Sequence, residues 1–141
     1  MTNNTSTSQI TLTDQDKLTL AVAAHGAIAL ITAAGVKSAG KIAVAGALAL
    51  SSATGPVGHA LTEKQKSVKL KGKSTAELAD TALPALTASM GLLGQQDAAE
   101  AGNFRSTVLT AVEAGARAER GGTGPAMVEM IRKITEALDA A

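Results

Sequence analysis

Residues 18–36, LTLAVAAHGAIALITAAGV, contain no Asp, Glu, Lys or Arg, and residues 42–60, IAVAGALALSSATGPVGHA, form a second stretch without a charge. Ala is the commonest residue in both stretches. Ala is also the strongest helix former, whereas strands favour β-branched and aromatic residues. Thr13, Asp14 and Asp16 precede the first stretch as an N-cap and an acidic first turn. We therefore predict an apolar N-terminal helical hairpin, with one helix ending near Gly35 and a second over residues 38–52.

The hairpin raises the question of a membrane, because residues 18–36 are about as long as a bilayer span requires. His25 near the middle of the first stretch, and the Ser, Gly, Pro and His residues of the second, disfavour insertion. Trp and Tyr, which mark membrane interfaces, are absent from the sequence. We predict a hairpin buried in protein, and keep membrane contact through residues 18–61 as an alternative. The polar start has no early Lys or Arg, so we expect no signal peptide and a cytoplasmic location.

The length of 141 residues fits one domain. Residues 1–9 are Thr, Asn, Ser and Gln after the initial Met, so we predict a disordered polar arm over residues 1–12 and a single helical domain over residues 13–141. Lys and Gly gather in residues 57–73, which we interpret as a basic, solvated connection with a short helix at residues 59–66.

The C-terminal half shows three amphipathic helices. Ser74 and Glu77 form a capping box before the first, in which Pro84 predicts a kink or a break near Thr81. Asp97 opens the second helix, which extends to about residue 119. A glycine-rich turn at residues 121–124 precedes the last helix, which carries one apolar stripe. The fold class we predict is all-α, a bundle of five to six helices in which these amphipathic helices pack on the apolar hairpin.

The order of these segments resembles a known family. An Ala/Leu helix from residue 74, then DAAEAGNFR at residues 97–105, VEAGARAE at residues 112–119, a glycine-rich turn and a terminal helix is similar to a family of small, Ala-rich, all-helical bacterial proteins of uncharacterised function. Residues 24–41 resemble the hairpin of that family. The turn GGTGP at residues 121–125 departs from the family pattern, in which aromatic residues stand between the glycines. The resemblance implies an all-helical fold and no catalytic residue.

Composition argues against several functions. A net charge of +1 and a single aromatic residue lack the basic surface and the stacking side chains of a nucleic-acid-binding protein. The chain has no Cys, which removes disulfides, thiolate zinc sites and thiol nucleophiles. The Lys residues at 64–73 can contact nucleic acid or acidic lipid, but the balanced total charge favours a solvated loop. We expect no nucleic-acid partner.

Two histidines are the first candidate site residues. His25 and His59, brought together by the hairpin, could bind a metal or haem iron. We expect no carboxylate within a turn of either histidine to complete a divalent metal site, and the His-Glu-x-x-His spacing is absent. We therefore interpret both histidines as structural and predict neither metal nor cofactor.

The carboxylates and the glycine-rich turn are the other candidates. Five carboxylates lie at the starts of predicted helices, where capping and the helix dipole explain an acidic residue: Asp14, Asp16, Glu77, Asp97 and Glu100. We interpret Glu113 and Glu119, with Arg117 and Arg120, as pairs on the polar face of one helix. Gly121–Gly124 beside those arginines could bind an anion, but we interpret the glycines as a helix-terminating turn. No nucleophile, base and orienting group can be named together, so we predict no enzymatic activity and no catalytic residues.

The function favoured by the sequence is structural. Residues 18–61 carry more uncharged helix surface than three amphipathic stripes can cover, which indicates self-association into homo-oligomers through Ala/Gly-rich helix faces. A first alternative is a bundle that binds a small apolar ligand or a lipid, with Met90, Met127 and Met130 adapting to the ligand. A second alternative is the membrane-associated hairpin.

Overall fold

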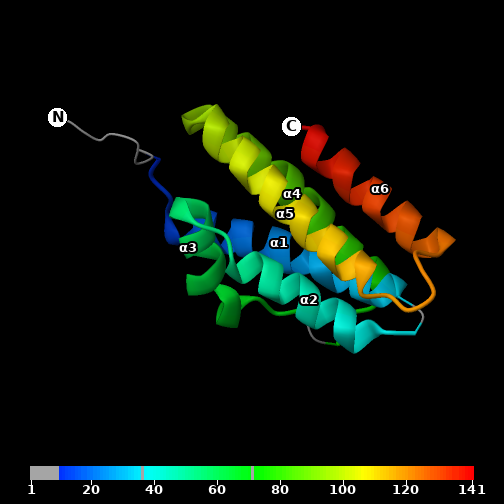
Figure 1. Ribbon diagram of the computed structural model, residues 1–141. Coiled ribbons are helices and arrows are strands. Elements are labelled where there is room, and N and C mark those ends of the chain that lie inside the picture. Colours follow the sequence, from blue (N-terminus) through cyan, green and yellow to red (C-terminus); the bar gives the residue numbers. More distant parts are fainter. Residues whose placement is uncertain (1–9, 36, 71) are drawn as a thin grey trace.

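The computed structural model describes residues 10–35, 37–70 and 72–141, and these residues form an all-α bundle (Figure 1). Six α-helices occur among them, together with one short 3-10 turn at Gln65–Ser67, and the described ranges contain no strand. Their bounds are α1 Asp14–Ala34, α2 Ala39–Ser51, α3 Gly55–Glu63, α4 Thr75–Gln96, α5 Ala98–Arg117 and α6 Pro125–Asp139. The predicted fold class is confirmed. Residues 1–9 of the predicted polar arm lie outside the described residues. The prediction of disorder is wrong for residues 10–12: Ile10 and Leu12 pack on the core, and the amide and carbonyl of Thr11 are both hydrogen-bonded to the Gln96 side chain.

Helix α1 is the central element of the bundle. It begins as predicted with a capping box, in which Thr13 Oγ1 accepts from the Asp16 amide and the Asp16 carboxylate accepts from the Thr13 amide. It contacts every other α-helix of the described chain. Its largest buried side chains are Leu20, Leu30 and Ile31. Most sides of this helix meet protein, which accounts for its apolar residues, while a stripe that includes Ala29, Thr32 and Ala33 is only partly covered or exposed.

The same helix satisfies the length and composition of a membrane span. It is the single such helix among the described residues, while α2 is apolar but shorter. Half of the candidate window in α1 is buried inside the bundle. The core helix of a bundle passes the same test of length and composition, so the hydropathy of α1 does not by itself indicate a membrane.

Glycines let the helices approach closely. A Cβ on Gly26 of α1 would lie 2.6 Å from the Cβ of Ala82 in α4, and a Cβ on Gly46 of α2 would lie 2.8 Å from Ile28. A Cβ on Gly115 of α5 would lie 2.6 Å from Ile31. Contacts below 3.0 Å cannot exist, so these three positions set the separations of α4, α2 and α5 from α1.

The interpretation of residues 57–73 as a solvated connection is wrong in its first part. The helix begins at Gly55, four residues before the predicted start, and ends at Glu63. Val57, Ala60 and Leu61 are buried against the core. Their spacing of three and four residues is that of a helix with one apolar face, which the neighbouring lysines obscured in the sequence. The connection proper starts after α3.

Helix α4 begins at the predicted capping box, in which the Ser74 amide donates to the Glu77 carboxylate. This hydrogen bond holds the pKa of Glu77 below its usual value. The helix then continues through Pro84, so the predicted break near Thr81 does not occur. Pro84 removes only the hydrogen bond to the carbonyl of Asp80, which is an exposed residue whose carbonyl water can reach. Buried leucines on both sides of the proline keep the helix in place.

Helices α5 and α6 complete the bundle. Asp97 caps α5 as predicted, with its carboxylate accepting from the Ala99 amide. Pro125 occupies the first turn of α6, and the apolar stripe of α6 is buried through Met127, Ile134 and Leu138. Figure 1 shows α6 lying alongside the α4–α5 pair as an outer helix.

Substitution of Gly26, where α1 approaches α4, tests this packing. We expect Gly26→Ala to lower the free energy of unfolding by about 1–3 kcal/mol, because Ala82 has no side-chain torsion with which to move aside. Gly102→Ala in α5 is the matched control, since a Cβ there meets nothing within 4 Å. It should raise stability by about 0.5–1 kcal/mol through helix propensity. Urea denaturation followed by circular dichroism measures both, and equal effects would contradict the close approach.

Candidate functional site

The outer side of α2 exposes apolar side chains. Val44 is 60% exposed and Leu48 is 65% exposed, while Ile42, Gly46 and Leu50 on the opposite side are buried. We define the α2 face as the exposed residues of this helix that recur every three or four positions: Gly40, Lys41, Val44, Ala47, Leu48 and Ser51. Lys41 carries the single charge of this face.

A buried carboxylate positions the start of α2. Glu119, which follows α5, is 7% exposed. Its Oε1 accepts from the amides of Ser38 at 3.0 Å and Lys37 at 3.2 Å. In return, Ser38 Oγ accepts from the Arg120 amide at 3.1 Å. A carboxylate at a helix N-terminus satisfies amides that lack partners within the helix and interacts favourably with the helix dipole. These contacts fix the N-terminus of α2 to the C-terminal end of α5.

The prediction of a surface pair is therefore wrong for Glu119. The residue follows the last turn of α5, where the chain bends back toward the start of α2. Glu113 and Arg117 do lie exposed on α5, but among the described residues they form no ion pair with each other. Nothing in the local sequence separates Glu119 from an ordinary helix-end carboxylate. Its partners are 81 and 82 positions away along the chain.

Shallow surfaces lie on both sides of the α2 face. Toward α1, an open apolar depression of about 600 Å³ is lined by α1 side chains with Ala43 and Leu70. Toward α5, a smaller depression of about 220 Å³ is lined mainly by hydroxyl and amide side chains. These are Ser52, Thr54, Asn103, Ser106, Thr107 and Thr110. The α2 face thus continues into uncharged surface on either side.

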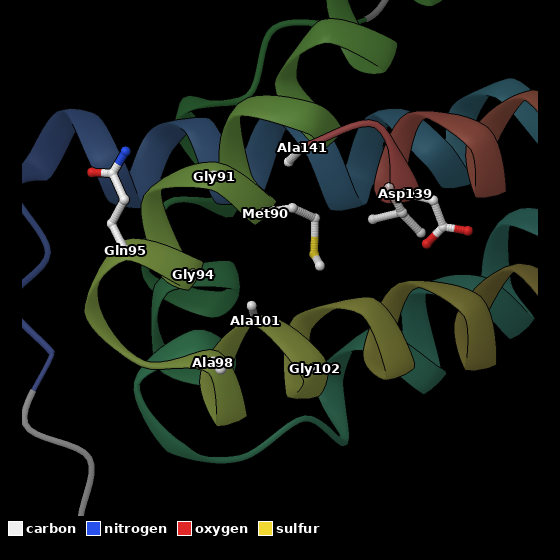
Figure 2. Close-up of a pocket in the computed structure, with 10 residues that line it drawn as sticks. Met90, Gly91, Gly94, Gln95, Ala98, Ala101, Gly102, Asp139 and Ala141 are labelled. Carbon is white, nitrogen blue, oxygen red and sulfur yellow. The ribbon is translucent and has the colours of Figure 1, made fainter.

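A second groove lies between the C-terminal ends of α4 and α6 and the start of α5 (Figure 2). Its volume is about 660 Å³, and small residues such as Gly91, Gly94 and Ala101 form much of its lining. Figure 2 shows the Met90 side chain extending into the space between the helices. Asp139 at the rim accepts from Arg105 Nε at 2.8 Å, so its charge is already paired. Of the three methionines expected to contact a ligand, Met90 lines this groove, Met127 is buried, and Met130 is half-buried against the core outside the groove.

The two histidines have different partners. His25 Nε2 lies 3.2 Å from the carbonyl oxygen of Leu61, which links α1 to α3. His59 is exposed and lies 3.2 Å from Glu63 Oε1. The hydrogen bond from Lys17, with the nearby charges of Lys64 and His59, holds the pKa of Glu63 below its usual value. Among the described residues, no three His, Cys, Asp or Glu side chains gather as a metal site.

The glycine-rich turn has a conformational explanation. Gly121 and Gly122 have φ angles of 83° and 92°, which side chains other than Gly rarely adopt. A Cβ on Gly121 would lie 3.7 Å from Lys37 Nζ, so the Lys37 ammonium group lies beside this turn.

In the basic connection, Lys64 pairs with Asp14 at 3.5 Å, while Lys66, Lys69 and Lys73 are exposed.

Comparison of the chain with models of protein families, with curated proteins and with solved structures finds no match. The resemblance to small Ala-rich bacterial proteins stays a prediction. The function must be argued from the geometry above.

The role of the buried carboxylate can be measured. We expect Glu119→Ala to lower the free energy of unfolding by about 1–3 kcal/mol, because the amides of Lys37 and Ser38 lose their acceptor. Glu113→Ala, on the exposed side of α5, should change it by less than about 0.5 kcal/mol. Urea denaturation at neutral pH gives both values. If the two substitutions cost the same, Glu119 does not hold α2.

Proposed function

We propose that this chain is a non-enzymatic structural protein that self-associates through the α2 face. The observation that carries the proposal is the exposure of Val44 and Leu48 on one side of a helix whose single exposed cation is Lys41. Contiguous exposed apolar surface on a soluble bundle marks an interaction site. Val128 on α6 is exposed too, but Glu129 and Arg132 are its neighbours along that helix, and isolated apolar residues of this kind are ordinary.

Self-association needs more than two side chains. Full burial of a Val or Leu side chain contributes about 1.5–3 kcal/mol. Association costs at least about 4 kcal/mol in lost translational and rotational freedom. The uncharged surface beside α2, which includes Ala29, Thr32 and Ala33 of α1, supplies further area. A partner that covers both α2 and this part of α1 therefore gains enough to bind, and we expect an association that depends on concentration.

The non-enzymatic part of the proposal follows from the scatter of reactive groups. His25, His59 and Glu119 are each engaged in a contact between or within helices. The exposed carboxylates Glu129 and Asp139 are paired with arginines. Among the described residues neither histidine is hydrogen-bonded to a hydroxyl side chain, whereas nucleophilic catalysis requires a nucleophile and a base in such contact.

Light scattering coupled to size exclusion, without detergent, tests self-association across a wide range of concentration. We expect the natural chain to exceed the monomer mass as concentration rises. Leu48→Glu should return it to the monomer, because a carboxylate would have to be desolvated at the interface. The matched control is Val128→Glu, which adds the same charge at a residue of similar exposure and should leave the mass unchanged. A monomer at every concentration rejects the proposal.

The groove of Figure 2 favours a second candidate, binding of a small apolar ligand such as a fatty acid. Its volume lies within the range of known ligand sites, and Met90 provides an adaptable apolar contact.

A fluorescent fatty acid titrated into the protein tests this second candidate. Gly94→Leu should abolish the binding, because a Cβ at Gly94 meets no atom within 4 Å and the side chain would occupy the groove. Ala126→Leu is the control: it adds the same side chain at an exposed position on α6 outside the groove lining, and should leave binding unchanged. Equal binding by all three proteins, or none by the natural chain, rejects the candidate.

A further inference from the structure

We propose that the partner on the α2 face is a second copy of this chain, related by two-fold symmetry, with its α2 antiparallel to the first. In this arrangement Lys41 of each copy lies at the C-terminal end of α2 in the other. The inference rests on the proposed self-association and adds its geometry.

The first argument is the position of the apolar residues along the face. The stripe consists of Lys41, Val44, Leu48 and Ser51, at spacings of three and four. Along the helix axis its midpoint lies at the level of Gly46, which itself faces the core. An antiparallel copy centred there places Val44 opposite Leu48 and Lys41 opposite Ser51. Every apolar side chain of the stripe then meets an apolar side chain, and a two-fold axis makes the two halves of the contact equivalent.

The second argument is the charge distribution of α2. Its first turn carries Lys41 and no acidic residue, and its last turn carries no basic residue. A cation is favourable at the C-terminus of a helix and unfavourable near the N-terminus. Within one chain the N-terminal end of α2, which carries Lys41, has the Glu119 carboxylate beside it, whereas the C-terminal end has no cation. A parallel pair would bring the two Lys41 side chains together, whereas an antiparallel pair supplies each α2 with the cation that its C-terminus lacks.

The residues around Lys41 permit this contact. Gly40 and Ala47 are small and exposed, so a second helix can approach α2 closely. The aliphatic part of the Lys41 side chain can cover apolar surface while its ammonium group reaches the last turn of the other helix. There the Leu48 carbonyl already accepts from Ser51 Oγ at 2.8 Å and from Ser52 Oγ at 3.2 Å, so the ammonium group interacts with the negative end of the helix dipole and not through a hydrogen bond to that carbonyl.

Cysteine cross-linking tests the arrangement, because the natural chain contains no Cys and any introduced thiol is unique. Lys41→Cys and Ser51→Cys are made separately, one with a size tag, and oxidised alone and as an equimolar mixture. Positions 41 and 51 are about 15 Å apart along one helix, so in the antiparallel pair the two copies of position 41 are separated by about the same distance. A disulfide needs Cα atoms within about 7 Å, so only the 41–51 pair can form one. Val128→Cys measures random collision, and light scattering is recorded on each variant.

We expect the mixture to give a 41–51 cross-linked dimer several-fold above each variant alone and above the Val128→Cys control. Cross-links between two copies of Lys41→Cys would indicate a parallel pair and overturn the inference, while self-association would stand. Oligomers by light scattering with cross-linking at the level of the control would also overturn it, by placing the interface elsewhere. Monomers throughout would reject the proposed function together with the inference.

Discussion

The close approach of α1 and α4 at Gly26 and Ala82 is the constraint on which the bundle depends. A chain with one Phe and no Trp or Tyr cannot fill wide gaps between helices. Its helices must come near enough for backbones and methyl groups to touch, which Gly26, Gly46 and Gly115 allow. The stability of the core then comes from many short contacts around α1, because no single side chain is large enough to dominate it.

This packing leaves α2 as an outer helix that needs a separate anchor. Its buried side, with Ile42, Gly46 and Leu50, packs on α1 and α5, but its N-terminus has no cap from its own side chains. Glu119 supplies the missing acceptor and Ser38 returns a hydrogen bond to the Arg120 amide. These hydrogen bonds join Ser38 to residues 119 and 120. The end of α5 therefore fixes the direction in which the α2 face points.

Features set by neighbouring residues were predictable from the sequence, and features set across the bundle were not. Thr13, Ser74 and Asp97 are caps whose partners lie within three residues, and each helix begins where they indicate. The break at Pro84 failed because the local cost of a proline is smaller than the gain from burying the leucines on either side.

The candidate site also has features that the local sequence predicts and features that it does not. Its apolar hairpin was visible as uncharged sequence, but which side of α2 stays exposed depends on α1 and α5. The amides bound by Glu119 lie more than eighty positions away, beyond the reach of any local pattern.

Val44 and Leu48 call for an explanation that the single chain does not provide. An exposed position on a helix favours Glu, Lys, Gln or Ala, all of which match or exceed Val in helix propensity and keep the surface soluble. Val44 contributes neither propensity nor burial within the bundle, and Leu48 is more exposed still. On α5 and α6 the comparable outward positions carry Glu113, Arg117, Glu129 and Arg132. The same chain therefore builds charged outer faces on two helices and an apolar one on α2, and this difference is the physical argument for the proposed interface.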